Sequence, residues 1–269
     1  MIATQRWWLR AKLIPVYLLA ALLWSPPLAS GAGADFSYFV SQLVPAPVRQ
    51  GADWWSVGPW LLSLWQSQGM QAVWQTLVLG TAALLGSGLL ALCVAPLVTP
   101  GSGNRASRAA SHLLLVLMRS TPEFLIAFVL LLLLGPSMLP GIIALSLHTG
   151  AIIAFLCARF STGIHLRDDA STNLSRYIWE LLPRLYPNFL AFSLYRWEIL
   201  MRETAILGIL GIQTLGFYVD SAFAEFRLDR ALALILMGVA LNLMVDALSR
   251  YLRTQLRIKS STHVMETQQ

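Results

Sequence analysis

Long apolar blocks separated by short polar stretches dominate the pattern of this chain. Six blocks reach the length of a membrane-spanning helix, and they cover residues 13–28, 72–97, 113–134, 139–157, 188–211 and 231–248. A helix rises ~1.5 Å per residue, so about 20 apolar residues cross a hydrocarbon layer ~30 Å thick. Because no water inside that layer can satisfy backbone groups, the blocks must be helical. The pattern predicts an all-α polytopic membrane protein with about six spans.

The composition supports this fold class. Hydrophobic residues make up 57% of the chain and charged residues 12%, whereas about a quarter of a typical soluble domain is charged. The formal net charge is +6. The basic residues flank the apolar blocks and do not form a patch with exposed aromatic side chains. We therefore expect the membrane as a partner and no nucleic acid.

The distribution of lysine and arginine predicts the orientation. With the N-terminus inside, the inside segments hold thirteen basic residues, which are Arg6, Arg10, Lys12, Arg105, Arg108, Arg159, Arg167, Arg176, Arg184, Arg250, Arg253, Arg257 and Lys259. The outside segments hold only Arg49, Arg227 and Arg230. Cytoplasmic segments carry the excess of Lys and Arg. A multi-pass protein of the bacterial inner membrane is expected, with both termini in the cytoplasm.

The N-terminal part, residues 1–69, allows alternatives. Basic residues precede a short apolar run, and Ala32-Gly33-Ala34 resembles a cleavage site, so the first block is either a span or a cleaved signal peptide. The stretch 35–68 is expected outside and is rich in tryptophan. It fits a segment lying in the headgroup layer, or a docking surface for an external partner. Residues 70–250 form the predicted transmembrane domain, and 251–269 a basic tail.

Two local features interrupt this plan. Ser120, Thr121 and Pro122 in the third block predict a kink or a restarted helix near the cytoplasmic surface. The loop 158–187 is expected inside and to hold an amphipathic helix. Its N-terminus would lie at Asp168 and Asp169, its apolar face would carry Leu174, Ile178 and Leu181, and Pro183 would end it.

Ionisable residues inside the predicted spans are candidate functional residues, because they are costly there. They are Arg119, Glu123, His148, Arg196, Glu198, Arg202, Glu203 and Asp246. Arg119–Glu123 and Glu198–Arg202 have i,i+4 spacing and can each form an ion pair on one helix. His148 is either a packing residue with hydrogen bonds or a functional one. Two arginines and two glutamates in the block 188–211 require that this helix face protein or a wet pathway.

Enzyme motifs are missing from the sequence. A phosphate-binding loop needs a lysine after glycine, and the two lysines, Lys12 and Lys259, do not follow glycine. The motifs HExxH and GxSxG are also absent, as is a Cys/His cluster. Cys93 and Cys157 lie in apolar runs and are expected to be small buried residues. We expect no catalytic residue, cofactor or metal, and ATP hydrolysis only on a separate subunit.

An ordered set of short motifs begins near Met118. Residues 119–127 are Arg-Ser-Thr-Pro-Glu-Phe-Leu-Ile-Ala, and residues 141–150 are Gly-Ile-Ile-Ala-Leu-Ser-Leu-His-Thr-Gly. Further matches follow at Leu182, Pro183, Leu194, Tyr195, Arg196, Trp197, Glu198, Arg202, Gly208, Asp246, Leu248 and Arg250. In order and approximate spacing this half of the chain resembles the phosphonate-type permeases of bacterial ABC importers, which have the type I importer fold.

The resemblance implies a permease subunit that translocates a phosphonate or related phosphorus oxyanion by ATP-driven alternating access. Its implied partners are an ABC ATPase subunit, a periplasmic substrate-binding protein, and a second permease in a homodimer or heterodimer. The implied ATPase-coupling residues are Asp169, Ala170, Leu174, Ile178, Leu181, Leu182 and Pro183. The pathway candidates are Arg119, His148, Arg196 and Arg202, with Glu123 and Glu198 in intramembrane ion pairs.

The chain departs from the family pattern at two places. Where the coupling loop of the family has Glu-Ala-Ala, this chain has Ile164-His165-Leu166, and Ala170 and Glu180 replace a glycine and an isoleucine. The family's glycine-rich turn keeps Gly208, Gly211 and Gly216 but has Gln213 and Thr214 in place of two glycines. A non-coupling structural subunit paired with a fuller permease is therefore the first alternative. A secondary transporter or membrane enzyme is the second, although no inverted repeat or catalytic motif supports it.

Overall fold

The computed structural model describes residues 32–99, 105–164 and 174–255. Among these residues the regular elements are all helical. The chain divides into two compact units, Met1–Val44 and Pro45–Gln269. The described part of the first unit is helix α2 (Ala32–Leu43). The first predicted span and the end of the basic tail lie outside the described residues.

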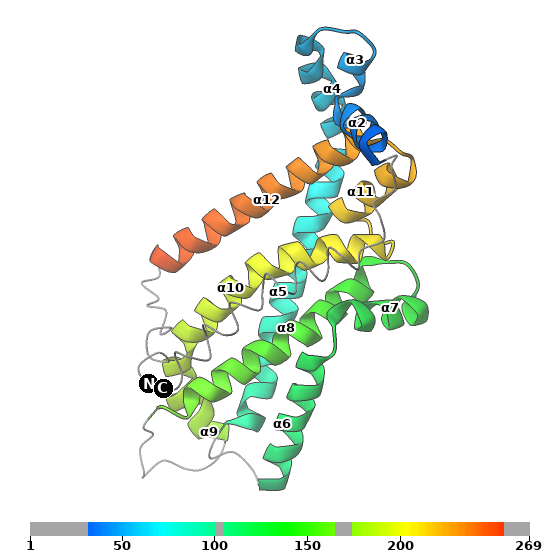
Figure 1. The fold of residues 1–269 in the computed structure, drawn as a ribbon. Coiled ribbons are helices and arrows are strands. Elements are labelled where there is room, and N and C mark those ends of the chain that lie inside the picture. The colour runs from blue at the N-terminus through cyan, green and yellow to red at the C-terminus, as the bar shows by residue number, and fades with distance from the viewer. Residues whose placement is uncertain (1–31, 100–104, 165–173, 256–269) are drawn as a thin grey trace, which may run out of the picture. The chain divides into compact units, whose positions relative to one another are not determined.

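The second unit contains long helices joined by short connections (Figure 1). In chain order they are α3 (Ala46–Arg49), a 3₁₀ turn (Trp54–Ser56), α4 (Val57–Leu64), a π-helical turn (Trp65–Gly69), α5 (Met70–Val98), α6 (Arg105–Ser120), α7 (Glu123–Leu134), α8 (Met138–Ser161), α9 (Leu174–Arg176), a π-helical turn (Tyr177–Leu181), α10 (Leu182–Ile209), α11 (Leu215–Ala224) and α12 (Leu228–Gln255). This is the all-α polytopic fold that the apolar blocks predict.

Four of the predicted spans correspond to single helices, namely α5, α8, α10 and α12. By length and apolarity, α8, α12 and the continuous run that ends in α5 can each cross a membrane. α10 is equally long, but four of its five charged residues lie within eight positions, between 196 and 203. The predicted block 113–134 is divided between α6 and α7. The sequence had not predicted the short helix α11.

The tryptophan-rich residues from Trp54 onward are helical and continue directly into α5. Residues Trp54–Val98 form one helical run of 45 residues through the 3₁₀ turn, α4, the π turn and α5. At ~1.5 Å per residue this run is ~68 Å long, more than twice the ~30 Å hydrocarbon layer. Its first part, which carries Trp60 and Trp65, therefore extends the span beyond the layer. The location of this segment in the headgroup layer stays a prediction, and the segment itself is helical through the π turn.

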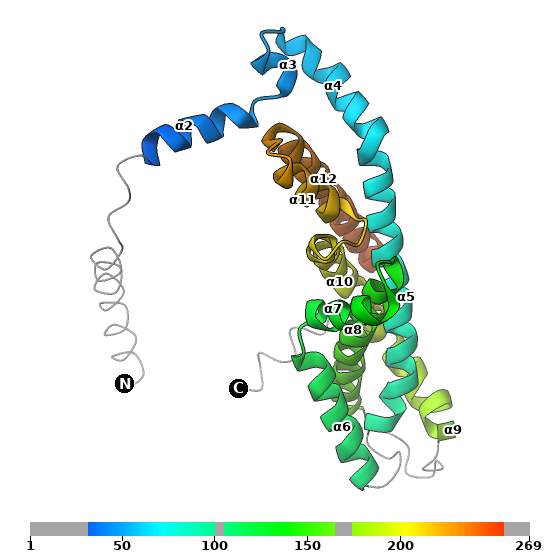
Figure 2. The ribbon, with the colours of Figure 1, turned by 90° about the vertical axis from the view of Figure 1, so that its right-hand side faces the viewer.

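Small residues on α5 allow the helices to pack closely. Ala83, Ser87 and Ala91 are buried on one face of α5, which packs extensively against α8 (Figures 1 and 2). Small side chains at such seams let backbones approach, and this packing is a main source of association between helices in lipid. Leu85 and Leu89, on the opposite face, are exposed.

The two cysteines differ in burial. Cys157 of α8 is buried as expected, whereas Cys93 of α5 is exposed, so the expectation that Cys93 is buried was wrong.

Two glycines let α10 and α11 meet. A Cβ atom at Gly208 would overlap the backbone at Phe217, and one at Gly216 would overlap the Ala205 carbonyl group. Gly211, between the two helices, has φ +93°, a conformation that glycine adopts without strain. The three glycines of the family turn that this chain keeps are therefore the ones on which the α10–α11 connection depends.

Candidate functional site

A break between α6 and α7 places the backbone of Thr121 beside α8. α6 ends at Ser120, α7 begins at Glu123, and the two helices are bent by 89°. Pro122 cannot donate a backbone hydrogen bond, and the Ser120 and Thr121 hydroxyls donate to carbonyl oxygens one turn back, at 2.7 and 2.9 Å. The sequence predicted this break near the cytoplasmic surface. In the structure it lies beside His148, close to the middle of α8.

His148 connects α8 to both sides of the break. Its Nδ1 atom lies 3.1 Å from the Thr121 carbonyl oxygen, and its Nε2 atom lies 3.7 Å from the Glu123 carboxylate. Because a carbonyl oxygen only accepts, the neutral ring carries its proton on Nδ1. A second proton, on Nε2, would complete an ion pair with Glu123. His148 itself is buried, at 9% exposed, whereas the Glu123 side chain is 20% exposed, so the contact is partly buried.

Arg196 of α10 reaches the residue next to His148. One Nη atom of Arg196 donates to the Thr149 hydroxyl at 3.0 Å and to the Glu203 carboxylate at 3.2 Å. Arg196 and Glu203 are seven positions apart, so they lie on one face of α10 two turns from each other. Their side chains are 10% and 13% exposed. Within the described residues, Nε of Arg196 and the second carboxylate oxygen of Glu203 have no hydrogen-bond partner.

Glu123, His148, Arg196 and Glu203 form one polar cluster, called the buried cluster below, in which His148 and Arg196 are buried and the two glutamates are partly buried. Glu203 lies within electrostatic range of the other three. Two carboxylates and one guanidinium give a net charge of −1 when the imidazole is neutral, and a proton on His148 makes the cluster neutral.

The predicted pair Arg119–Glu123 is not formed. Arg119 belongs to the last turn of α6 and Glu123 to the first turn of α7, and the break between them removes the helical i,i+4 geometry. The Arg119 guanidinium instead lies 4.1 Å from the centre of the Phe155 ring, a cation–π contact. Arg119 is exposed and lies outside the buried cluster.

The predicted pair Glu198–Arg202 is not formed either. Arg253 of α12 donates to the Glu198 carboxylate at 2.7 Å, so the ion pair joins two helices. Arg202 faces outward on α10 and makes no ion pair within the described parts of the chain. The sequence assigned Arg253 to a cytoplasmic tail. α12 continues to Gln255, which brings this arginine within reach of Glu198.

The predicted coupling segment is described only in part. Asp169 and Ala170 lie outside the described residues, and of Leu174 only the helical backbone is described. The structure separates Ile178 from Leu181, because Ile178 is 43% exposed and Leu181 is 3% exposed. The π-helical turn changes the register here, so the expected common face of these two residues is wrong.

The end of this segment also differs from the prediction. Pro183 does not terminate a helix, because it occupies the first turn of α10, which begins at Leu182. A proline is tolerated there, since the first N–H groups of a helix lack partners within it. Tyr177 and Leu181 face inward and pack with Leu185, whereas the neighbouring Trp179 is 80% exposed.

Sequence reasoning missed some of the site. Glu203 was recognised as a charge within a span but was not selected, although its spacing from Arg196 places both on one face. Nothing in the sequence indicated that the Thr149 hydroxyl accepts a hydrogen bond from Arg196. The pathway candidates divide into two groups: His148 and Arg196 lie in the buried cluster, whereas Arg119 and Arg202 lie outside it.

A bundle of long apolar helices around a buried charged cluster is the architecture of a membrane transport domain. The fold is similar to that in a crystal structure of an amino acid ABC transporter with histidines, with a TM-score of 0.60, covering 76% of this chain and 99% of that chain. The two sequences are 16% identical, so this likeness concerns the fold alone.

The family follows from the sequence match. Residues 94–258 match the model of the binding-protein-dependent transport system inner membrane component, and the chain belongs to this family. It is 27% identical over 152 residues to the phosphite transport system permease protein PtxC of Stutzerimonas stutzeri, covering 53% of this chain and 54% of that protein. It is 31% identical over 180 residues to the phosphate-import permease protein PhnE of Mycolicibacterium smegmatis, covering 62% of this chain and 32% of that protein. The chain thus spans about half of the first relative and a third of the second.

Proposed function

We propose that this chain is the membrane-spanning permease subunit of an ATP-driven importer, with a phosphonate or a related phosphorus oxyanion as cargo. The observation that carries the proposal is the buried cluster at the α6–α7 break, which lies within the region that matches the transport family. The two relatives described above are named for phosphite and phosphate transport, which supports a phosphorus oxyanion as cargo.

The cluster gives this function a physical mechanism. His148 of α8 contacts Glu123 of α7. Arg196 of α10 donates to the Thr149 hydroxyl of α8 and pairs with Glu203 on its own helix, so α8 is linked to both α7 and α10. A movement of α7 or of α10 relative to α8 must break or exchange one of these contacts, so the cluster biases the bundle toward one of two states. ATP binding on a separate subunit supplies the free energy that changes the preferred state. Arg196 and His148 become available to an anion only when Glu203 and Glu123 move away.

The partners in this proposal are an ABC ATPase subunit on the cytoplasmic side, an external substrate-binding protein and a second permease subunit. Exposure of Ile178 and Trp179, just before Leu182 and Pro183, supports an ATPase contact there. Such apolar side chains are costly on a water-exposed surface and fit the cleft of a protein partner. The proposal also places both termini in the cytoplasm.

Reconstitution tests the proposal directly. The full chain is purified in detergent with the ATPase and binding protein of the same organism, and ATP hydrolysis and uptake are measured in proteoliposomes with phosphite, phosphate and methylphosphonate. We expect the ATPase to co-purify and at least one of these anions to stimulate both activities. An ATPase that co-purifies but responds to none of the three anions would refute the cargo. Failure of the ATPase to bind at all would refute the coupled permease.

One observation favours a second function, that of a non-coupling subunit paired with a fuller permease. At the position of the family's Glu-Ala-Ala motif the chain has Ile164, His165 and Leu166, and Glu180 replaces an isoleucine. In that case the chain would assemble with another permease, and removing its own loop contact would leave uptake unchanged.

A further inference from the structure

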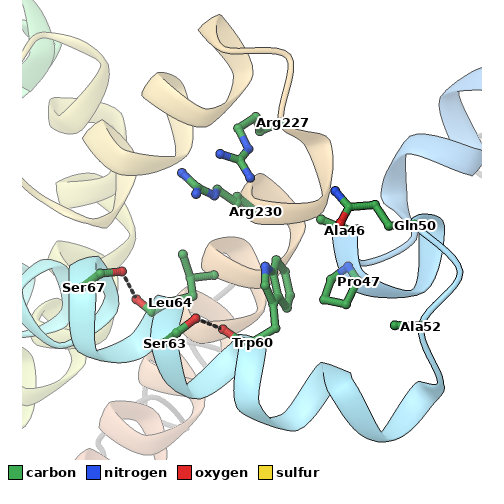
Figure 3. Close-up of a pocket in the computed structure, with 10 residues that line it drawn as sticks. All are labelled: Ala46, Pro47, Gln50, Ala52, Trp60, Ser63, Leu64, Ser67, Arg227 and Arg230. Carbon is green, nitrogen blue, oxygen red and sulfur yellow. Dashed lines mark hydrogen bonds between the residues drawn. The ribbon is translucent and has the colours of Figure 1, made fainter.

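A second polar site lies near the N-terminal end of α12, away from the buried cluster. A cavity of about 460 Å³ opens between the segment that carries α3, the helical run through α4, and the start of α12. Its size is within the range of ~300–1,000 Å³ that is typical of small-molecule sites. Figure 3 shows Arg227 and Arg230 beside Trp60, with Ala46, Pro47 and Gln50 on the neighbouring wall.

The lining of this cavity is cationic. Arg227 and Arg230 are partly buried, and neither forms an ion pair with another described residue. None of the ten lining residues is acidic. The predicted outside segments hold only three basic residues, and two of them line this cavity. In this respect Arg227 and Arg230 differ from Arg196, which forms an ion pair with Glu203.

Asp229, between the two arginines in sequence, has a different role. It is 2% exposed, and its carboxylate accepts a hydrogen bond from the Ala46 N–H at 3.2 Å. This bond fixes the start of α3 against α12 and so holds one wall of the cavity in place. Asp229 itself does not line the cavity, so its charge reduces the local positive potential without occupying the space.

The donors around the cavity define the chemistry of its ligand. The guanidinium groups offer only donors, in a fixed fork that matches the oxygens of a phosphate-type group. The Trp60 indole adds a donor, and the Gln50 amide provides donors together with one acceptor. The hydroxyls of Ser63 and Ser67 donate to carbonyl oxygens of their own helix at 2.7 and 3.2 Å, so their oxygens remain as acceptors. A donor-rich cavity with two arginines favours an anion with several oxygens.

We propose that this cavity binds a phosphorus oxyanion through Arg227 and Arg230. The choice of phosphorus rests on the proposed function of the chain, and the cavity would hold the anion on the outer side before it enters the bundle. The same chemistry belongs to the phosphate of an anionic lipid headgroup. These two sources of one ligand group are distinguished by experiment.

The binding test uses the full chain in nanodiscs of phosphatidylcholine, with titration of inorganic phosphate and of phosphite by calorimetry. Variants Arg227→Gln, Arg230→Gln and the double variant are compared with Arg49→Gln, which removes an exposed arginine outside the cavity lining. Each charge-assisted contact is strong enough that its loss weakens binding by about tenfold or more. We expect saturable binding in wild type and Arg49→Gln, weaker binding in the single variants and none in the double variant.

A second experiment tests whether the bound phosphate group belongs to an anionic lipid headgroup. If the ligand is a lipid headgroup, free phosphate does not bind, and phosphatidylglycerol raises the melting temperature of the wild type over phosphatidylcholine alone. That increase is lost in the arginine double variant and kept in Arg49→Gln. Either arginine-dependent result supports the oxyanion site. Anion binding and lipid stabilisation that are the same in the double variant and in Arg49→Gln would overturn it, and the single variants give the same test if the double variant aggregates.

Uptake by the reconstituted transporter separates this inference from the proposed function. Wild-type uptake of phosphite together with no arginine-dependent binding would reject the cavity and leave the permease function intact. Arginine-dependent binding without any uptake of phosphorus oxyanions would reject the cargo and leave the site.

Discussion

The pair formed by Arg196 and Glu203 leads to a prediction about unequal effects of single substitutions. We consider Arg196→Met, Glu203→Leu and the double variant, each of which replaces a charge by an apolar side chain. The matched control is Arg202→Met, on the same helix, because Arg202 is exposed and has no ion pair among the described residues.

The charges of the cluster determine the expected order. With neutral His148, Arg196→Met leaves Glu123 and Glu203, so the net charge changes from −1 to −2, and a buried carboxylate loses its partner. Breaking a buried pair in this way costs about 3–5 kcal/mol. Glu203→Leu changes the net charge from −1 to 0 and removes one charge-assisted hydrogen bond, worth about 1.5–3 kcal/mol.

The double variant restores the original charge of −1 and leaves neither partner behind. Apolar replacement of a whole buried pair is often nearly neutral, and the Thr149 hydroxyl loses one donor at a cost of about 1 kcal/mol. We therefore expect the double variant to be less destabilised than Arg196→Met alone. The control Arg202→Met should change stability by no more than about 0.5 kcal/mol.

Equilibrium unfolding measures this order. The purified chain is titrated with sodium dodecyl sulfate in dodecyl maltoside micelles, and helicity is followed by circular dichroism. Equal destabilisation by the two single substitutions, with additive effects in the double variant, would show that Arg196 and Glu203 do not interact and would refute the cluster. Loss of uptake in a stable double variant would further assign the pair to the transport cycle.

Three further predictions concern packing, coupling and topology. Gly216→Ala places a methyl group against the backbone of α10, so we expect the melting temperature and yield to fall steeply. Gly238→Ala is the control and should be tolerated, because Gly238 has room for a methyl group. Equal stability of the two variants would contradict the close α10–α11 contact. Ile178→Asp should release the ATPase during co-purification and stop uptake while the chain stays folded, since burying an unpaired carboxylate costs several kcal/mol. Unchanged ATPase retention and uptake would favour the non-coupling subunit. A reporter near Ser137 should read external and one after Lys259 cytoplasmic, and a cytoplasmic reading at Ser137 would contradict the six-span topology.

Local sequence signals predicted the helices because the physics that forms them is local. A long apolar run must satisfy its own backbone in lipid, so the positions of α5 and α8 followed from the sequence within a few residues, whereas α12 continues seven residues beyond its predicted end. Pro122 predicted the helix break from a local property as well, because proline has no backbone N–H to donate within a helix. The contact of the break with His148 could not be predicted, since it depends on how far α6 extends beside α8.

The sequence by itself thus determined the fold class, the family and which residues bring charge into the membrane. Only the tertiary structure decided which charges meet: Glu198 with Arg253, and Arg196 with Glu203. Helices that are apolar on nearly all sides give little signal about the face each turns inward, and i,i+4 spacing only permits a pair. Rotation, tilt and the break at Pro122 set the partners, because charged groups that cannot face lipid bind the nearest opposite charge that packing supplies.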